Sequence, residues 1–163
     1  QQTDLTPTQG SEFINSYFNK YPKIKMYIEN TKNHVKEFGY VQTLLGRKRY
    51  IPEIGAPNHL VRASAERMAI NLPIQGTAAD MIKIAMININ EYLINSQMKT
   101  KMIIQVHDEL IFQVPKEELD QTTKLVITQM ESAMKIKVPI YVDVKTGPNW
   151  GELYDLKSKY NHI

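Results

Sequence analysis

The chain has 163 residues, 42% of them hydrophobic, which suits one globular domain with one main core. Its 20 basic and 17 acidic residues give a formal charge of +3, too small a surplus to establish a nucleic-acid partner by itself. The absence of cysteine excludes disulfides and thiolate metal sites, and no apolar run reaches the length of a membrane span.

The first forty residues predict two helices. Thr6 is a suitable helix cap, Pro7 suits the first helical position, and Gln9 can reach back to complete a capping box. A second helix is expected from Lys23 to Phe38, with Gly39 as its left-handed stop. The lysines along both helices favour a solvated surface over phosphate contact.

A small hairpin or extended loop is expected next. Tyr40–Leu44 and Arg49–Ile51 are strand-like and are joined around Leu45–Gly46. Arg47 and Arg49, with the lysine between them, place cations near the tip. A basic tip can contact a phosphate backbone or keep a sheet edge soluble, and the sequence favours neither interpretation.

A row of hydrogen-bond donors lies in the following helix. The sequence predicts a helix over His59–Asn71 that Pro73 interrupts. Arg67, Asn71 and Gln75 follow at intervals of four, with Gln75 expected on the turn just beyond the helix. The minor groove of duplex DNA presents acceptors at every base pair, so these donors could contact it without reading sequence. Alternatively, they form a polar face that bonds neighbouring loops.

The second half of the chain predicts a buried helix and further strands. Gly76–Asn95 is apolar on nearly every side, which indicates a central helix under a sheet. Another helix is expected to start at Pro115–Glu118, and Ile140–Lys145 alternates as a strand. Gly147–Gly151 breaks that strand, and the tail to Ile163 is expected to be short and loosely held.

The stretch Lys101–Val114 predicts two short strands that meet at a polar tip, His107-Asp108-Glu109. A hairpin can close without carboxylates, so formation of the turn does not by itself explain why an acidic pair lies there. Mg²⁺ prefers carboxylate oxygens and keeps waters for a phosphate-bearing substrate, which would supply a reason. Taken alone, however, an acidic pair at a turn is more often simply solvated.

Several stretches, in the same order, resemble family A DNA polymerases, the bacterial DNA polymerase I type. Gln105–Leu110 resembles the third catalytic motif of the palm, Glu66–Asp80 the segment before it, and Gly39–Tyr50 a loop in the fingers-to-palm region. The likeness extends from about Thr8 to Trp150. It implies an α+β fold, with helices packed on a small antiparallel sheet. Residues 1–58 would be part of the fingers and a connecting hairpin, and residues 59–163 would be palm.

The resemblance also implies roles for the candidate residues. Asp108 would be one of two aspartates holding Mg²⁺ in a two-metal phosphoryl-transfer site, and Glu109 would support the metal or the primer end. The expected partners are primer-template DNA, deoxynucleoside triphosphates and the rest of the polymerase chain, with no membrane. The expected DNA contacts are Arg67, Asn71, Gln75, His107, Arg47 and Arg49.

The sequence departs from the whole family pattern at its start. The family's other metal aspartate and its nucleotide-gripping helix lie upstream of anything matched here, and the first residue is Gln1. We therefore expect the C-terminal part of a cytoplasmic, nucleoid-associated polymerase of replication and repair, inactive when isolated. Two alternatives stay open: the palm of a single-subunit RNA polymerase, and a DNA-binding fragment without catalysis.

Overall fold

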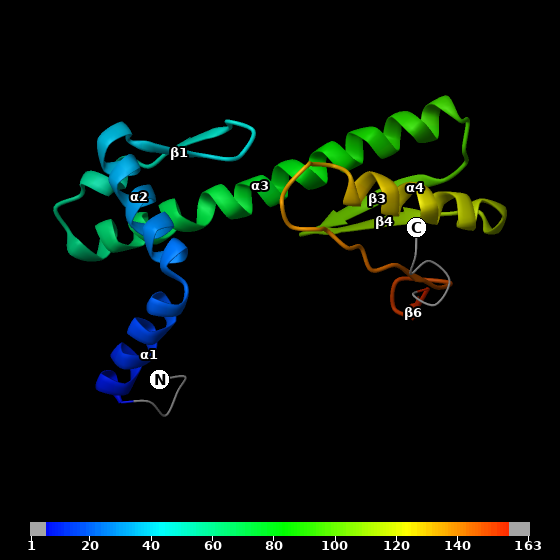
Figure 1. The fold of residues 1–163 in the computed structure, drawn as a ribbon. Helices are drawn as coiled ribbons and strands as arrows, with labels where there is room; N and C mark the ends of the chain where they lie inside the picture. The colour runs from blue at the N-terminus through cyan, green and yellow to red at the C-terminus, as the bar shows by residue number, and fades with distance from the viewer. Residues whose placement is uncertain (1–5, 157–163) are drawn as a thin grey trace. The chain divides into compact units, whose positions relative to one another are not determined.

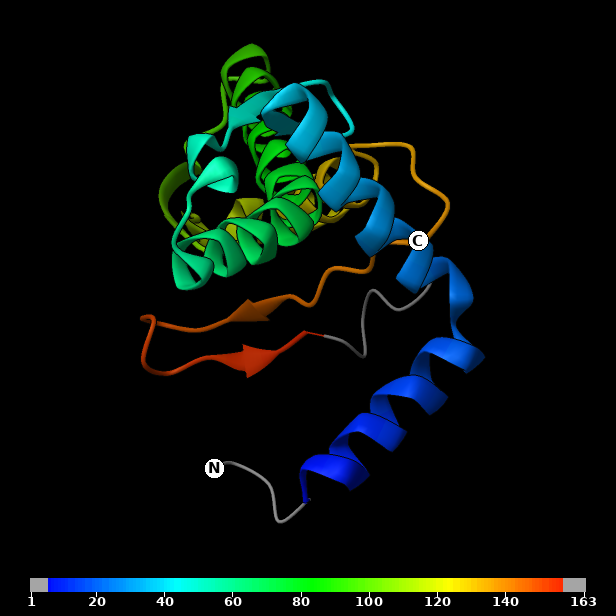
Figure 2. The same cartoon turned by 90° about the vertical axis from the view of Figure 1, so that its left-hand side faces the viewer.

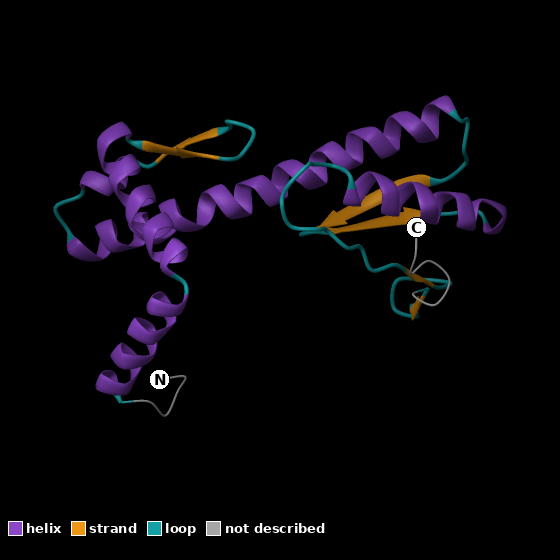
Figure 3. Cartoon of the chain, in the orientation of Figure 1, coloured by secondary structure: helices purple, strands orange, loops and turns teal. Residues whose placement is uncertain are grey.

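The computed structural model describes residues 6–156 and has an α+β fold, as predicted. The six strands form three separate antiparallel pairs, β1–β2, β3–β4 and β5–β6, each made of strands that are consecutive along the chain (Figures 1 and 3). The helices are α1 (Pro7–Lys20), α2 (Pro22–Phe38), α3 (His59–Asn95) and α4 (Leu119–Glu131), with short 3₁₀ turns η1 (Pro52–Gly55) and η2 (Lys116–Glu118). The strands are β1 (Tyr40–Gln42), β2 (Lys48–Tyr50), β3 (Lys101–Val106), β4 (Glu109–Gln113), β5 (Lys145–Thr146) and β6 (Tyr154–Asp155).

The contacts divide the chain into two compact units, Gln1–Thr77 and Ala78–Ile163. The single main core expected from the chain length is therefore wrong, because each unit has its own hydrophobic cluster. The division into fingers and palm stays a prediction. The first cluster contains Val35, Val41, Ile51, Ile54, Ala65 and Ala69. The second contains Ala85, Ile89, Leu93, Leu125 and Val126.

The helix boundaries of the first unit follow local chemistry. Thr6 and Gln9 form the predicted capping box, in which the Thr6 hydroxyl accepts from the Gln9 amide at 3.3 Å. Gly39 ends α2 with φ of 75°, a left-handed conformation that glycine adopts at little cost. The second helix begins at Pro22, one residue before the expected start, because proline suits the first helical turn.

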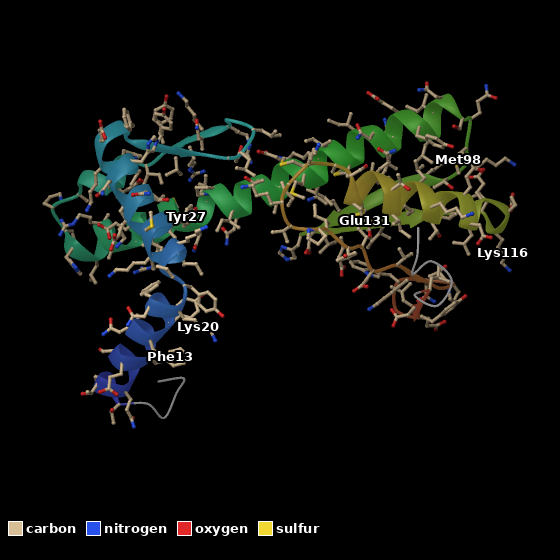
Figure 4. All side chains as sticks on the ribbon, in the orientation of Figure 1. Phe13, Lys20, Tyr27, Met98, Lys116 and Glu131 are labelled. Atoms are coloured by element: carbon tan, nitrogen blue, oxygen red, sulfur yellow. The ribbon has the colours of Figure 1, made fainter. Side chains whose placement is uncertain are left out.

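Helix α3 passes through Pro73 without ending, so the predicted interruption is wrong. Proline removes the N–H that would donate to the carbonyl of Ala69. Side chains bond to carbonyls nearby: the Tyr27 hydroxyl donates to the Ile70 carbonyl at 2.8 Å, and the Thr77 hydroxyl donates to the Pro73 carbonyl at 2.6 Å. Figure 4 labels Tyr27 on α2. Its burial raises the pKa of Tyr27. One bond from another helix and one bond within α3 therefore accompany the helix where the sequence alone weakens it.

An ion-pair cluster joins α2 to α3. The Glu66 carboxylate lies 2.8 Å from the Lys32 ammonium and 3.3 Å from that of Lys36. The hydrogen bond from Lys32 is the main cause that holds the pKa of Glu66 below its usual value. Lys32 and Lys36 therefore pair with a carboxylate of the protein itself. Neither the solvated-surface nor the phosphate interpretation predicted this partner.

The second unit buries the second half of α3 against α4 and the β3–β4 sheet. Ile89 is fully buried there, and Leu110 and Phe112 of β4 are partly buried against the same cluster. The predicted helix under a sheet is thus confirmed, but neighbours do not cover it on nearly every side, since Ile87 is 57% and Ile94 66% exposed. No helix in the described ranges is long and apolar enough to span a membrane.

The predicted strand over Ile140–Lys145 is wrong over most of its length, since only Lys145–Thr146 pairs with another strand. The amide of Val142 donates to the Glu131 carboxylate at 3.0 Å, so a side chain takes the backbone donor that a strand partner would use. Figure 2 shows β5 and β6 as the orange and red arrows of a hairpin. Residues 157–163 of the expected tail lie outside the described residues.

Glu118 ties the start of β3 to η2. Its carboxylate accepts from the amides of Lys99 and Thr100, both at 2.8 Å, and from the Thr100 hydroxyl at 2.6 Å. The bond from the hydroxyl is the largest of the causes that lower the pKa of Glu118. These bonds need the ionised carboxylate, so they are complete above the ordinary glutamate pKa and are lost as the pH falls through the lowered value.

We therefore expect Glu118→Gln to weaken protection of the Lys99 and Thr100 amides against hydrogen exchange at neutral pH. The difference from the wild type should shrink as the pH falls through the lowered pKa of Glu118, where the wild-type carboxylate also becomes protonated. Glu117→Gln is the matched control, because Glu117 is an exposed neighbour. Equal loss of protection in both variants would contradict a specific role for the Glu118 carboxylate.

Candidate functional site

The predicted polar tip is a tight turn between β3 and β4. Val106 pairs with Glu109, which leaves His107 and Asp108 as the two turn residues. His107 has φ of +54°, whereas Asp108 has no positive φ. That sign pattern is typical of a type II′ turn, whose first central position usually takes glycine. The Gln105 side-chain amide donates to the His107 carbonyl at 3.0 Å and so bonds across the turn.

The β3 strand that leads to this turn contains an irregularity. Met102 pairs with Phe112 and Ile104 with Ile111, so Ile103 is an extra residue, a β-bulge. Ile104 is 42% exposed, and the bulge breaks the alternation that would place Met102, Ile104 and Val106 on one side of a regular strand. Bulges increase local twist and redirect the chain, often beside functional sites.

The acidic residues of the turn are open to solvent. The side chains of His107, Asp108 and Glu109 are all exposed. Carboxylate oxygens are the ligands that Mg²⁺ prefers, so Asp108 fits as a ligand from this turn. Within residues 6–156, no three His, Asp or Glu side chains gather closely enough to hold a metal ion by themselves. At this turn Asp108 therefore presents one exposed carboxylate that could act as a metal ligand.

The continuity of α3 changes the geometry of the donor row. Arg67, Asn71 and Gln75 all lie on one helix, at four-residue intervals, and all are exposed. Each interval turns the helix by only about 40°, so the three side chains follow a shallow stripe. Gln75 had been expected just beyond the helix, and that placement is wrong. The row belongs to the first unit and the acidic turn to the second.

The basic hairpin tip has a protein partner that the sequence did not reveal. The predicted hairpin is confirmed, and both Arg47 and Arg49 are exposed on it. The Arg47 guanidinium donates to the Gly76 carbonyl at 3.0 Å. The sequence signal for this contact was Gly76, because a glycine inside a helical pattern usually has a packing reason.

The comparisons with known proteins agree with this architecture. Residues 1–152 match the sequence profile of DNA polymerase family A. The chain is 48% identical over 148 residues to DNA polymerase I of Caldicellulosiruptor bescii, covering 91% of this chain and 17% of that protein. It is 45% identical to DNA polymerase I of Bacillus subtilis, covering 96% of this chain and 18% of that protein.

A solved structure is also similar. The polymerase domain of Pol1 from M. smegmatis, in complex with DNA primer-template and dNTP, superposes with a TM-score of 0.82. It is 37% identical, and the match covers 85% of this chain and 24% of that chain. The chain belongs to DNA polymerase family A. It spans less than a fifth of the length of these DNA polymerase I relatives.

Proposed function

We propose that this chain is the C-terminal part of a DNA-directed DNA polymerase, comprising most of the palm and part of the fingers. The intact protein adds deoxynucleotides to a primer 3′ end in DNA replication and repair. The observation that carries the proposal is the exposed Asp108 carboxylate at a tight turn, within a chain whose residues 1–152 match the family. The cytoplasm, at the nucleoid, is the proposed location.

In this proposal, the acidic turn is the metal-binding contribution of the chain. Asp108 holds Mg²⁺, and Glu109 supports the metal or the primer end, since neighbouring residues of an extended strand point opposite ways. When bound in a pair, Mg²⁺ ions stabilise the attacking 3′ oxygen and the leaving pyrophosphate. The other aspartate belongs to the rest of the polymerase chain, which also grips the deoxynucleoside triphosphate.

The DNA contacts are proposed from chemistry and exposure. Arg67, Asn71 and Gln75 present donors along one exposed stripe, and the minor groove of duplex DNA presents acceptors. His107 lies next to the proposed metal ligand and contacts the same primer end. Arg47 and Arg49 at the hairpin contact the phosphate backbone, so the affinity for DNA is expected to fall as the salt concentration rises.

Primer extension tests the proposal. The intact polymerase is expected to extend a primed template with deoxynucleotides, whereas the purified 163-residue chain is expected to give no extension. One aspartate cannot hold two Mg²⁺ ions in the required geometry. Extension by the chain alone would contradict the shared metal site. Preference of the intact protein for ribonucleotides would favour an RNA polymerase, and duplex binding without extension would favour a non-catalytic fragment.

The donor row gives a second expected result. Gln75→Ala in the intact polymerase should weaken primer-template binding by about 1 kcal/mol, roughly fivefold, as expected for one lost hydrogen bond. The loss should be similar across template sequences, because minor-groove acceptors occur at every base pair. Asn90→Ala, another exposed amide on α3 but outside the row, is the control. A strongly sequence-dependent loss, measured by fluorescence anisotropy, would argue against minor-groove contact.

A further inference from the structure

The loop between β1 and β2 contacts α3 directly beside Gln75. The Arg47 guanidinium donates to the Gly76 carbonyl at 3.0 Å, and the Leu44 amide donates to the Thr77 hydroxyl at 3.0 Å. That hydroxyl in turn donates to the Pro73 carbonyl at 2.6 Å. Thr77 is only 7% exposed, so the two bonds of its hydroxyl are partly shielded from water, whereas the Arg47 bond to Gly76 is exposed. We call the loop Thr43–Arg47 the brace.

Gly76 is the point where the brace comes closest to the helix. A Cβ added at Gly76 would lie 2.7 Å from the Thr43 methyl carbon, inside the 3.4 Å at which ordinary contact begins. Thr43 is 3% exposed and also accepts the Arg47 amide through its hydroxyl at 3.2 Å, so it cannot easily move aside. Glycine costs a helix interior about 1 kcal/mol relative to alanine. Its presence here therefore has a packing reason.

The helix is intrinsically weak at this position. Pro73 supplies no N–H to the preceding turn, and Gly76 adds conformational freedom three residues later. Between Pro73 and Gly76, the backbone hydrogen bonds of the helix alone therefore constrain the direction of the Gln75 side chain poorly. The brace bonds to the C-terminal end of that weak segment, at Gly76 and Thr77, and within the helix the Thr77 hydroxyl bonds back to the Pro73 carbonyl.

We propose that Gly76 is a positioning residue: its missing side chain lets the brace seat on α3 and fix the direction in which Gln75 meets the primer end. This inference rests on the proposed function, because it gives a role to Gln75 in primer handling. A hydrogen bond weakens steeply as its angle departs from linearity, so a shifted Gln75 loses its contact with DNA. The brace would then act on binding of the primer-template and not on the nucleotide.

The test compares variants of the intact polymerase in steady-state primer extension. Gly76→Ala is expected to raise KM for primer-template about fivefold while KM for the deoxynucleotide stays unchanged, the effect of losing one hydrogen bond. Adding Thr43→Ser removes the obstructing methyl and keeps the hydroxyl, so the double variant should return most of the way to the wild type. Gly10→Ala is the control, since a Cβ there meets nothing within 4 Å.

A double-mutant cycle separates positioning from general stability. In the Gln75→Ala background, Gly76→Ala should add little, because the side chain being positioned is already absent. An equal fivefold effect in both backgrounds, or no effect of Gly76→Ala on primer-template KM, would overturn the inference while leaving the polymerase function standing. Failure of the wild-type protein to extend any primer would overturn the proposed function, and this inference with it.

Discussion

Replacing Asp108 by alanine in the intact polymerase is expected to lower kcat for primer extension by roughly a thousandfold. A ligand to a catalytic metal supports several kcal/mol of transition-state charge stabilisation, and each 1.36 kcal/mol corresponds to about a factor of ten in rate. Asp108 is exposed at a turn, so its replacement leaves no cavity and the fold should survive. Rapid-quench measurement of single-nucleotide addition checks the rate, and a binding titration checks the duplex affinity.

The same experiment has a direct control in Asp155→Ala, which removes another exposed carboxylate from the second unit. It should extend primers at the wild-type rate. Asp108→Asn keeps the size of the side chain but lacks the charge, and it should be nearly as impaired as Asp108→Ala. If synthesis continued in Asp108→Ala, Asp108 would not be a metal ligand and the proposed function would lose its central observation.

Ile89→Ala is expected to destabilise the second unit by about 2–5 kcal/mol, the range for emptying a buried aliphatic site. Ile89 is 0% exposed and lies in the cluster shared by α3 and α4. The β4 strand that follows the acidic turn packs on this cluster through Leu110 and Phe112, so loosening the cluster should also disturb the turn. Urea unfolding followed by hydrogen exchange of β4 amides measures both effects.

Ile87 provides the comparison, because it lies on the same helix but is 57% exposed. Ile87→Ala should change the free energy of unfolding by no more than about 0.5 kcal/mol, as is usual for surface positions. Similar destabilisation by Ile89→Ala and Ile87→Ala would mean that the face of α3 that carries Ile89 does not form the core of the second unit.

Local signals in the sequence predicted the features that depend on a few neighbouring residues. The Thr6 capping box, the Gly39 stop and the tight turn at His107-Asp108 each arise from short-range chemistry. Two of them are ends of helices, and the third is closed by pairing of adjacent strands. For such features the structure follows closely from residue type and spacing.

Features that depend on distant partners were not predictable in this way. Pro73 is a helix breaker by local rules, and the Tyr27 hydroxyl that bonds beside it comes from another helix. Ile140–Lys145 has a strand pattern, yet Glu131 takes the Val142 amide. The bond from the Arg47 side chain to the Gly76 backbone carbonyl likewise joins residues 29 positions apart in the chain. In each case the outcome was decided by a tertiary hydrogen bond, which periodicity does not encode.

The left-handed backbone at His107 affects how substitutions there should be compared. A histidine with φ of +54° carries a local conformational penalty of about 1 kcal/mol or more, which glycine avoids and asparagine partly avoids. Most replacements at this position therefore change two things together: they remove the imidazole, and they alter the conformational strain of the main chain. A mutational library needs His107→Gly and His107→Asn as its baseline, so that loss of the ring is measured against variants that accept the turn.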